Sequence, residues 1–246
     1  MKYKNIYLYI IVLIFYLIIT FFLAHYIGLD RHWTSRYDHE FTLIYNALLF
    51  NNGIPIEYIQ HPGYFSVLNL SLFFKILSFL DLIKVDKLSL IKSENFNQSF
   101  QILVFYSRIY STIFVAIFCT IIFFIFYKFS NKKIYSFILS LILFSLPGTI
   151  YHLTDFRTEL MAMIFLVLSF VCLKIFFQKE TKYRYLSLVC FFIFMIFGLI
   201  NKMQIFFFLP LFLIPLYFSK KFVLKFDLKN FKFLENKFLP FILDPI

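Results

Sequence analysis

Long apolar runs separated by short polar stretches are the dominant pattern of this 246-residue chain. The hydrocarbon core of a bilayer is roughly 30 Å thick, and about 20 apolar residues of α-helix are needed to cross it. The pattern therefore predicts an all-α fold, a polytopic transmembrane helix bundle of about six spans. Runs close to the required length lie at about residues 6–24, 109–127, 134–151, 160–177, 184–200 and 203–218.

One further apolar segment, residues 64–80, is interrupted by Asn69 and Lys75. Counting it as a span would move the lysines of two later connections to the outer side, whereas short cytoplasmic loops tend to keep positive charge. We therefore expect this segment to lie on the outer face of the membrane or to dip into it.

The stretch of about residues 25–108 then forms a long first outer loop that carries surface helices. Its first helix is predicted to be amphipathic and to end at Asn52-Gly53, because apolar residues recur at helical spacing after Glu40. Asp38 stands where an N-cap is expected. Since a helix start also holds a carboxylate ionised, Asp38 is either a cap or a catalytic base.

Composition and charge agree with a membrane protein. The chain is 61% hydrophobic and 15% charged, with a mean hydropathy of +0.82, which leaves too little polar surface for a soluble globule. With the N-terminus in the cytoplasm, the whole formal charge of +11 lies on the inner side, so the basic pI requires no nucleic-acid partner. We expect a multi-pass integral protein of the bacterial cell (inner) membrane.

Two features of small secreted proteins are not expected here. The first apolar run follows a basic N-terminus, but no small-residue cleavage site follows it, so it should remain as an anchor. The cysteines lie inside apolar runs without disulfide or zinc spacing and are predicted to be packing residues. They are Cys119, Cys172 and Cys190.

Acidic residues gather at two places on the predicted outer side, Asp38/Glu40 and Asp155/Glu159. His152 stands three residues before Asp155, and Glu159 four after it, so the three share one face if the helix starts early. Alternatively, Arg157 neutralises the acidic pair as a simple loop ion pair.

Lys202 lies between the last two apolar runs. A lysine at membrane depth costs roughly 2.5–3.5 kcal/mol on insertion scales, so it either extends to the surface or meets an anion, for which a lipid phosphate is the natural candidate. His61, before Pro62, is either a polar loop residue or part of a binding site.

Several short motifs follow one another in an order that resembles the GT-C class of membrane glycosyltransferases, which includes the protein mannosyltransferases and the aminoarabinose transferases. The motifs are Tyr37-Asp38-His39-Glu40, Asn52-Gly53, His61-Pro62-Gly63, Ser107-Arg108-Ile109-Tyr110-Ser111, Leu146-Pro147-Gly148, Arg157-Thr158-Glu159 and Gly198-Leu199-Ile200-Asn201-Lys202.

The resemblance implies transfer of a sugar, with inversion, from a polyprenyl-phosphate donor to a lipid, glycan or protein acceptor on the outer face. Asp38 matches the catalytic aspartate of the class, and Glu40 is assigned to catalysis with it, although the class often has the glutamate directly after the aspartate and here His39 stands between them. The resemblance assigns substrate binding to His61, Arg108, Asp155, Arg157, Glu159 and Lys202. Carboxylates can take the acceptor proton and stabilise a cation-like sugar, and cationic groups can stabilise the departing phosphate.

The resemblance covers residues 1–218, the N-terminal catalytic half of such proteins. Residues 219–246 are expected to form a basic tail at the cytoplasmic face, with lysines at helix-like spacing, that leads toward a further span. A divalent metal is compatible with the acidic residues and His39, but their spacing does not require one.

The alternative function is a lipid or oligosaccharide transporter or flippase, or a non-catalytic membrane subunit. A transporter is expected to have polar or Gly/Pro-broken spans. Here the interiors of the apolar runs are nearly free of ionisable residues.

Overall fold

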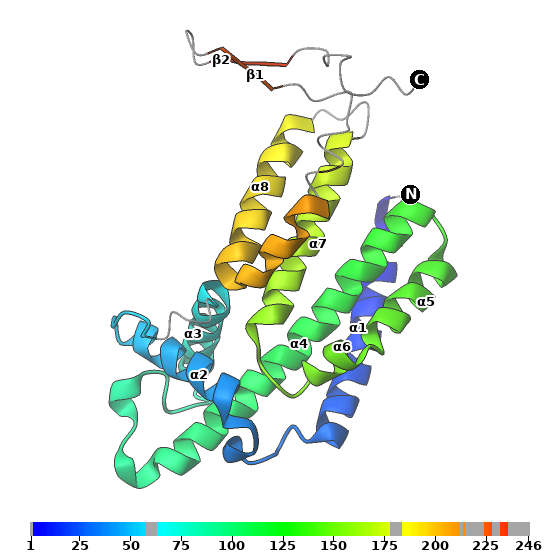
Figure 1. Cartoon of the computed structure of the whole chain (residues 1–246). Coiled ribbons are helices and arrows are strands. Elements are labelled where there is room, and N and C mark those ends of the chain that lie inside the picture. The colour runs from blue at the N-terminus through cyan, green and yellow to red at the C-terminus, as the bar shows by residue number, and fades with distance from the viewer. Residues whose placement is uncertain are drawn as a thin grey trace. The chain divides into compact units, whose positions relative to one another are not determined.

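The computed structural model describes residues 2–57, 63–177, 184–211, 214, 224–227 and 232–235, with side chains described except at 2–5, 36–39, 184 and the last two ranges. The chain divides into two units, Met1–Met203 and Gln204–Ile246. Figure 1 labels the elements. In the first unit they are α1 (Lys2–Ile27), η1 (Trp33–Arg36), α2 (Tyr37–Asn51), α3 (Tyr64–Phe79), η2 (Leu88–Leu90), η3 (Ser93–Asn95), α4 (Phe96–Ser130), α5 (Lys133–Phe144), α6 (Pro147–Tyr151), α7 (Thr158–Phe177) and α8 (Arg184–Asn201).

Near the C-terminus the described elements are the 3₁₀ helix η4 (Met203–Phe208) and two antiparallel strands, β1 (Leu224–Asp227) and β2 (Lys232–Glu235). The strands replace the helix-like segment expected there. Apolar and charged residues alternate along β1, a period of two that favours a strand over a helix. The all-α prediction is confirmed for the described part of the first unit.

Within the described residues, three helical segments are long and apolar enough to cross a membrane: Ile6–Ile27, Ser93–Ser130 and Thr158–Phe177. They correspond to the first, second and fourth predicted spans. The membrane character of the chain is therefore supported by half of the apolar runs that predicted it.

The other predicted spans are shorter or interrupted. The run 134–151 is broken, because Leu146 has an extended backbone (φ −63°, ψ 137°) before Pro147, and a residue before proline disfavours the α conformation. The fifth run forms an apolar helix, Tyr185–Asn201, below the length needed. The sixth begins as a 3₁₀ helix, and most of its remainder lies outside the described residues.

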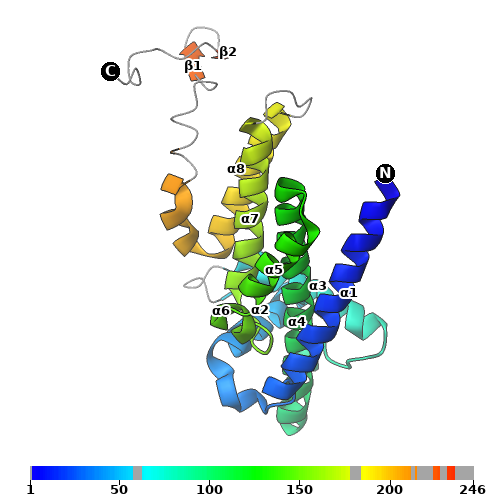
Figure 2. The same cartoon turned by 90° about the vertical axis from the view of Figure 1, so that its right-hand side faces the viewer.

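Helices α1, α4 and α5 run side by side, and α7 pairs with α8 (Figures 1 and 2). Tyr16 of α1 is fully buried against α4 and α5, and its hydroxyl lies 2.5 Å from that of Ser140. Cys119 is buried in the same core, as predicted for a packing residue, and all three cysteines are free.

A second core joins α2, α3 and the first turns of α4. Leu48, Leu70, Phe74 and Leu103 are 0% exposed within it. The apolar face of α2 is thus covered by protein, whereas the sequence predicted that it would lie against the membrane. Helix α3, at 16 residues, is roughly 24 Å long and is too short to cross a core of roughly 30 Å.

The C-terminus of α2 agrees with the sequence prediction, whereas its N-terminus does not. At its C-terminus Gly53 has φ +74°, and Ile54 N donates to Leu49 O, which forms the glycine-terminated stop expected from Asn52-Gly53. At the N-terminus the helix begins at Tyr37, directly after η1, so Asp38 lies in the first turn and is not the N-cap. Its side chain is outside the described set.

Candidate functional site

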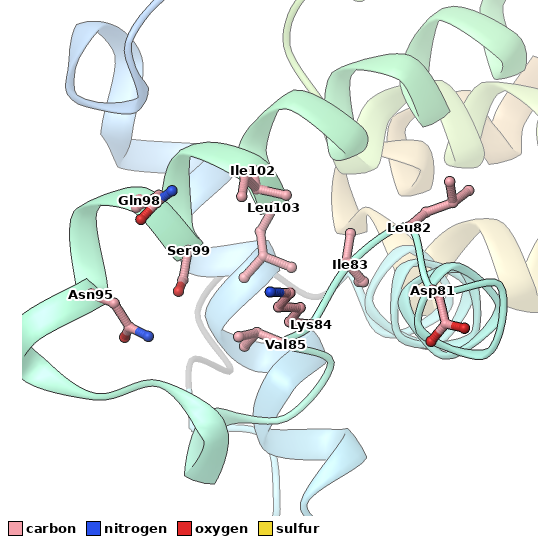
Figure 3. A pocket seen from close by; sticks show the side chains of 10 residues that line it. All are labelled: Asp81, Leu82, Ile83, Lys84, Val85, Asn95, Gln98, Ser99, Ile102 and Leu103. Atoms are coloured by element: carbon pink, nitrogen blue, oxygen red, sulfur yellow. The ribbon is translucent and has the colours of Figure 1, made fainter.

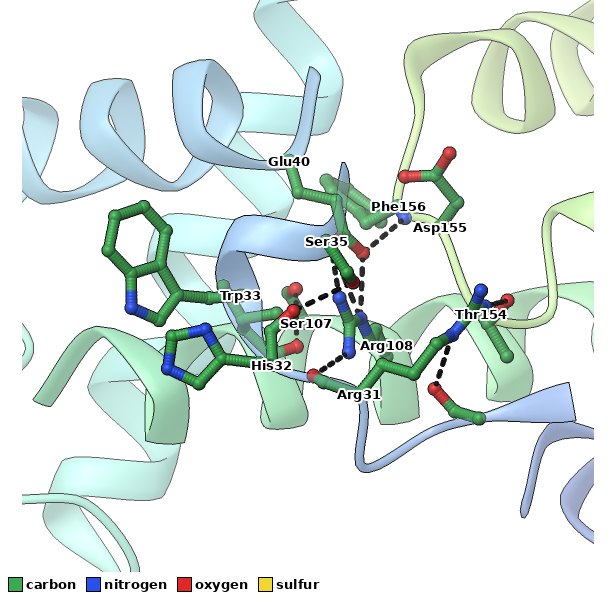
Figure 4. Close-up of polar contacts among 12 residues, drawn as sticks. Arg31, His32, Trp33, Ser35, Glu40, Ser107, Arg108, Thr154, Asp155 and Phe156 are labelled. Atoms are coloured by element: carbon green, nitrogen blue, oxygen red, sulfur yellow. Dashed lines mark hydrogen bonds and ion pairs between the residues drawn. The ribbon is translucent and has the colours of Figure 1, made fainter. Parts of the chain in front are cut away.

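Polar side chains from five distant parts of the chain meet where α1, α6 and α8 end, where α7 begins, and beside the middle of α4. We call this group the polar junction. It comprises Arg31, Glu40, Arg108, His152, Thr154, Asp155, Arg157, Glu159, Asn201 and Lys202. Figure 4 shows its buried half.

The centre of that half is an ion pair between Arg108 and Glu40. Arg108 Nε and Nη2 lie 3.1 and 2.9 Å from Glu40 Oε1 and Oε2, and both side chains are 1% exposed. Arg108 Nη1 donates to the carbonyls of Leu29 and Arg31, and the backbone N–H of Phe156 donates to Glu40 Oε1. The pair therefore fastens α2 and α4 to the chain after α1 and to the chain before α7.

Glu40 was predicted to be catalytic, but this geometry favours a positioning role. Burial raises the pKa of Glu40 above its usual value, although the hydrogen bonds and charge of Arg108 oppose that rise. With both oxygens held by donors and almost no exposed surface, Glu40 has no free face for a substrate. Arg108, predicted to bind substrate, is enclosed in the same way.

The segment between α6 and α7 is held by hydroxyl groups of α4. Ser111 Oγ donates to His152 O at 2.6 Å, and Thr112 Oγ1 donates to Leu153 O at 2.8 Å. Arg31 Nη2 donates to Thr154 Oγ1 at 3.0 Å. These bonds keep the segment out of the helix, so α7 begins only at Thr158. The early helix start that would place His152, Asp155 and Glu159 on one helical face therefore does not occur.

Asp155 is 2% exposed, and its Oδ1 has no hydrogen-bond partner among the described residues. Its Oδ2 lies 3.6 Å from Arg157 Nε, which is the loop ion pair named as the alternative. The carboxylate points away from the Arg108 guanidinium (Figure 4). Burial lowers the pKa of the neighbouring His152, whose Nδ1 also lacks a hydrogen-bond partner in the described part of the chain.

The more exposed half of the junction is the ion pair between Glu159 in the first turn of α7 and Lys202 just after α8. Lys202 Nζ lies 2.7 Å from Glu159 Oε1, and the side chains are 17% and 35% exposed, respectively. The anion that Lys202 meets is thus a carboxylate of this chain. The sequence alternative, in which Arg157 neutralises both acids, therefore holds for Asp155 but not for Glu159, which pairs with Lys202.

Asn201 joins three helices beside this pair. It is 0% exposed, donates to Thr158 O at 2.6 Å and accepts from the backbone and hydroxyl of Ser66 at 3.1 and 3.2 Å. Gly63 allows the start of α3 to lie directly against α7, because a Cβ on Gly63 would stand 2.3 Å from Thr158 Cγ2. This explains the glycine of the His61-Pro62-Gly63 motif. His61 itself lies outside the described residues.

Sequence reasoning did not assign roles to Arg31, Thr154 or Asn201. The signals for Arg31 and Asn201 were present, since each is a polar residue at or just after the end of an apolar run. For Thr154 the sequence offers no comparable signal. Among the described side chains, no group of three or more His, Cys, Asp or Glu residues is arranged to hold a metal ion.

Comparison with family models, with curated proteins and with solved structures finds no match for this chain. Its function has to be argued from the polar junction itself.

Proposed function

We propose that the chain is a multi-pass membrane glycosyltransferase of the GT-C type, which moves a sugar from a polyprenyl-phosphate donor to an acceptor at the outer membrane surface. The observation that carries the proposal is the partly exposed Glu159–Lys202 pair at the ends of two apolar helices, with the buried carboxyl of Asp155 four residues before Glu159. A lipid-linked substrate would reach these groups from the bilayer.

The course of the chain supports one location for the whole junction. Helix α1 ends at it, α4 leaves it at Arg108, α5 and α6 return to it, α7 leaves it and α8 returns to it. From Arg108 to Ser130, α4 covers about 23 residues, roughly 34 Å, close to the thickness of a bilayer core. The junction would then lie at one membrane surface.

Charge supports the outer surface for the junction. The connection at the far end of α4 contains Lys128, Lys132 and Lys133. Cytoplasmic loops are enriched in lysine and arginine, so this end would be cytoplasmic and the junction would face outward.

The reaction needs few groups. An acceptor hydroxyl attacks the anomeric carbon of the sugar, the bond from that carbon to the phosphate oxygen breaks, and the acceptor proton passes to a carboxylate. Asp38 is proposed for that base from the resemblance, and Asp155 is a second carboxyl at the site. Lys202 and Arg157 would stabilise the polyprenyl phosphate that leaves. Glu40 and Arg108 would hold the segments in place.

The reaction is tested in membranes that contain the full chain, by mass spectrometry of polyprenyl-phosphate sugars and of glycosylated lipids and glycans. The chain should deplete one donor and create one glycosylated product. Asp38→Asn and Glu159→Gln should abolish both changes, while Glu94→Gln, an acid-to-amide change at an exposed 3₁₀ residue, should retain them. Unchanged transfer by Asp38→Asn would remove that residue from the mechanism, and an unchanged glycolipid profile with the chain present would reject the transferase.

A transporter or flippase for lipid-linked sugars is the second candidate. The observation in its favour is the broken path of α5 and α6 at Leu146–Pro147, since interrupted spans are typical of transporters. A flippase would move a fluorescent polyprenyl-phosphate sugar across vesicle membranes without altering it chemically. Mass spectrometry of the same vesicles distinguishes the two functions.

A further inference from the structure

A cavity lies away from the polar junction, between the chain that follows α3 and the first turns of α4 (Figure 3). Its volume is about 340 Å³, within the range of roughly 300–1,000 Å³ that is usual for small-molecule sites. Its floor is apolar, because Ile83, Val85 and Leu103 are 4%, 9% and 0% exposed. These residues belong to the core that joins α2, α3 and α4, so the floor is preformed.

The rim of this cavity is polar and almost free of net charge. Asn95, Gln98 and Ser99 contribute amides and a hydroxyl, each able to donate and to accept. Lys84 and Asp81 supply one charge of each sign. Such a rim suits a neutral ligand rich in hydroxyl groups, and the apolar floor suits the C–H face of a sugar ring. It provides too few cations for a phosphate.

A second cavity, of about 410 Å³, adjoins the first at Leu82 and Ile102. It is lined further by Gln101, Phe105 and Tyr106 of α4 and by Asp30, whose carboxylate disfavours an anionic ligand. The residues of α4 that line the two cavities form one broad face that covers about half of the helix circumference. They are Gln98, Ser99, Gln101, Ile102, Leu103, Phe105 and Tyr106.

This face leads to the polar junction. Gln101, which lines the second cavity, donates through Nε2 to Arg31 O, the carbonyl that also accepts from Arg108 Nη1, while Ser99 stands roughly 14 Å from Arg108 along the helix axis. If the junction lies at the membrane surface, the two cavities extend from it into water. A chain of sugar residues could therefore lie along α4 with its growing end at the junction.

We infer that the two cavities bind the acceptor, and that the acceptor is a neutral glycan chain with hydroxyl groups along its length. This inference rests on the proposed function, because it names the substrate that receives the sugar. The aromatic rings of Phe105 and Tyr106 would contact the sugar residue nearest the junction, and the amides of Asn95 and Gln98 the residues farther away.

The single tryptophan of the chain provides a direct assay. Trp33 packs against Phe96 and Phe100 at ring distances of 5.8 and 5.2 Å, and its backbone N–H donates to Gln101, which lines the second cavity. The fluorescence of the full chain in lipid nanodiscs is titrated with neutral tetrasaccharides of glucose and of N-acetylglucosamine. Glycerol phosphate serves as a charged probe. Saturable binding is expected for at least one tetrasaccharide and not for glycerol phosphate.

Variants locate the binding. Gln98→Ala removes exposed hydrogen-bonding groups without touching the core, and Ser99→Leu fills the cavity; each should weaken binding about tenfold. Asn97→Ala is the matched control, because Asn97 is exposed on the same turn but lines neither cavity. Equal affinity in all variants, or binding of glycerol phosphate alone, would overturn the acceptor site. If the original chain binds a tetrasaccharide but transfers no sugar, the result would instead count against the transferase.

Discussion

The Arg108 guanidinium binds the Glu40 carboxylate through two nitrogens, at 3.1 and 2.9 Å, where both side chains are 1% exposed. Residues 68 positions apart in the sequence are thereby joined at the point where the chain after α1 and the chain before α7 also meet. A fully hydrogen-bonded buried pair of this kind orients the elements that contribute to it.

Removing one partner of the pair should be strongly destabilising. Arg108→Met leaves Glu40 as a buried charge, and the loss of stability is expected to be about 3–5 kcal/mol. The double variant Glu40→Leu/Arg108→Met should recover only part of this, because the Leu29 and Arg31 carbonyls still lose their donor. Thermal unfolding in detergent measures the effect, with exposed Lys84→Met as the control. Equal melting temperatures for Arg108→Met and the control would contradict a structural role for the pair.

The close approach of Gly63 to Thr158 predicts that any side chain at position 63 destabilises the fold. In Gly63→Ala the new Cβ would stand 2.3 Å from Thr158 Cγ2, and overpacking of this kind costs about 1–3 kcal/mol. Thr158→Ser removes that methyl group and should restore the stability of the alanine variant. Gly148→Ala is the control, since its Cβ would meet no described atom within 4 Å. Thermal unfolding separates the variants, and a Gly63→Ala protein as stable as Gly148→Ala would refute the close approach.

The sequence predicted much of the fold, and its errors have identifiable causes. Three apolar runs correspond to helices long enough to cross a membrane. The second of them was predicted to begin at residue 109, whereas α4 begins at Phe96. The first turns of α4 contain Asn97, Gln98 and Gln101, which interrupt the apolar run. On the other side of the same turns, Phe100, Leu103 and Val104 are buried and recur at helical spacing. Periodicity, which a simple apolar run does not measure, would have revealed these turns.

The sequence named residues of the candidate site without their partners. The sequence indicated that Arg108, Asp155, Glu159 and Lys202 belong to one region, and the described structure brings them into the polar junction. It did not predict that Glu159 pairs with Lys202 or that Glu40 pairs with Arg108. Pairing depends on which helix faces approach in space, and that information is absent from the spacing within one segment.

His152 predicts a stability that falls as the pH falls. Burial lowers the pKa of this histidine, Arg157 reinforces the shift, and the Glu159 and Asp155 carboxylates oppose it. Because the unfolded chain binds the proton more tightly, stability is lost between a pH near 6.5, about the usual value, and the lower pKa of the folded state. His152→Gln should flatten this part of the pH profile of thermal unfolding. A slope in His152→Gln identical to that of the original chain would rule out His152.

The Glu159–Lys202 pair allows function to be separated from stability. The pair is partly exposed, so Glu159→Gln should cost at most about 1 kcal/mol. If Glu159 binds the substrate, as the resemblance implies, the same change should abolish sugar transfer. The exchanged pair Glu159→Lys/Lys202→Glu restores opposite charges at the same two positions but opposes the dipoles of both helix ends, and should therefore regain only part of the lost thermal stability. It should remain inactive, because the cation would then stand at the start of α7 and the carboxylate after α8. Donor consumption and thermal unfolding, measured on the same membrane preparations, test both halves. Full transfer by the exchanged variant would show that the pair only joins α7 to α8.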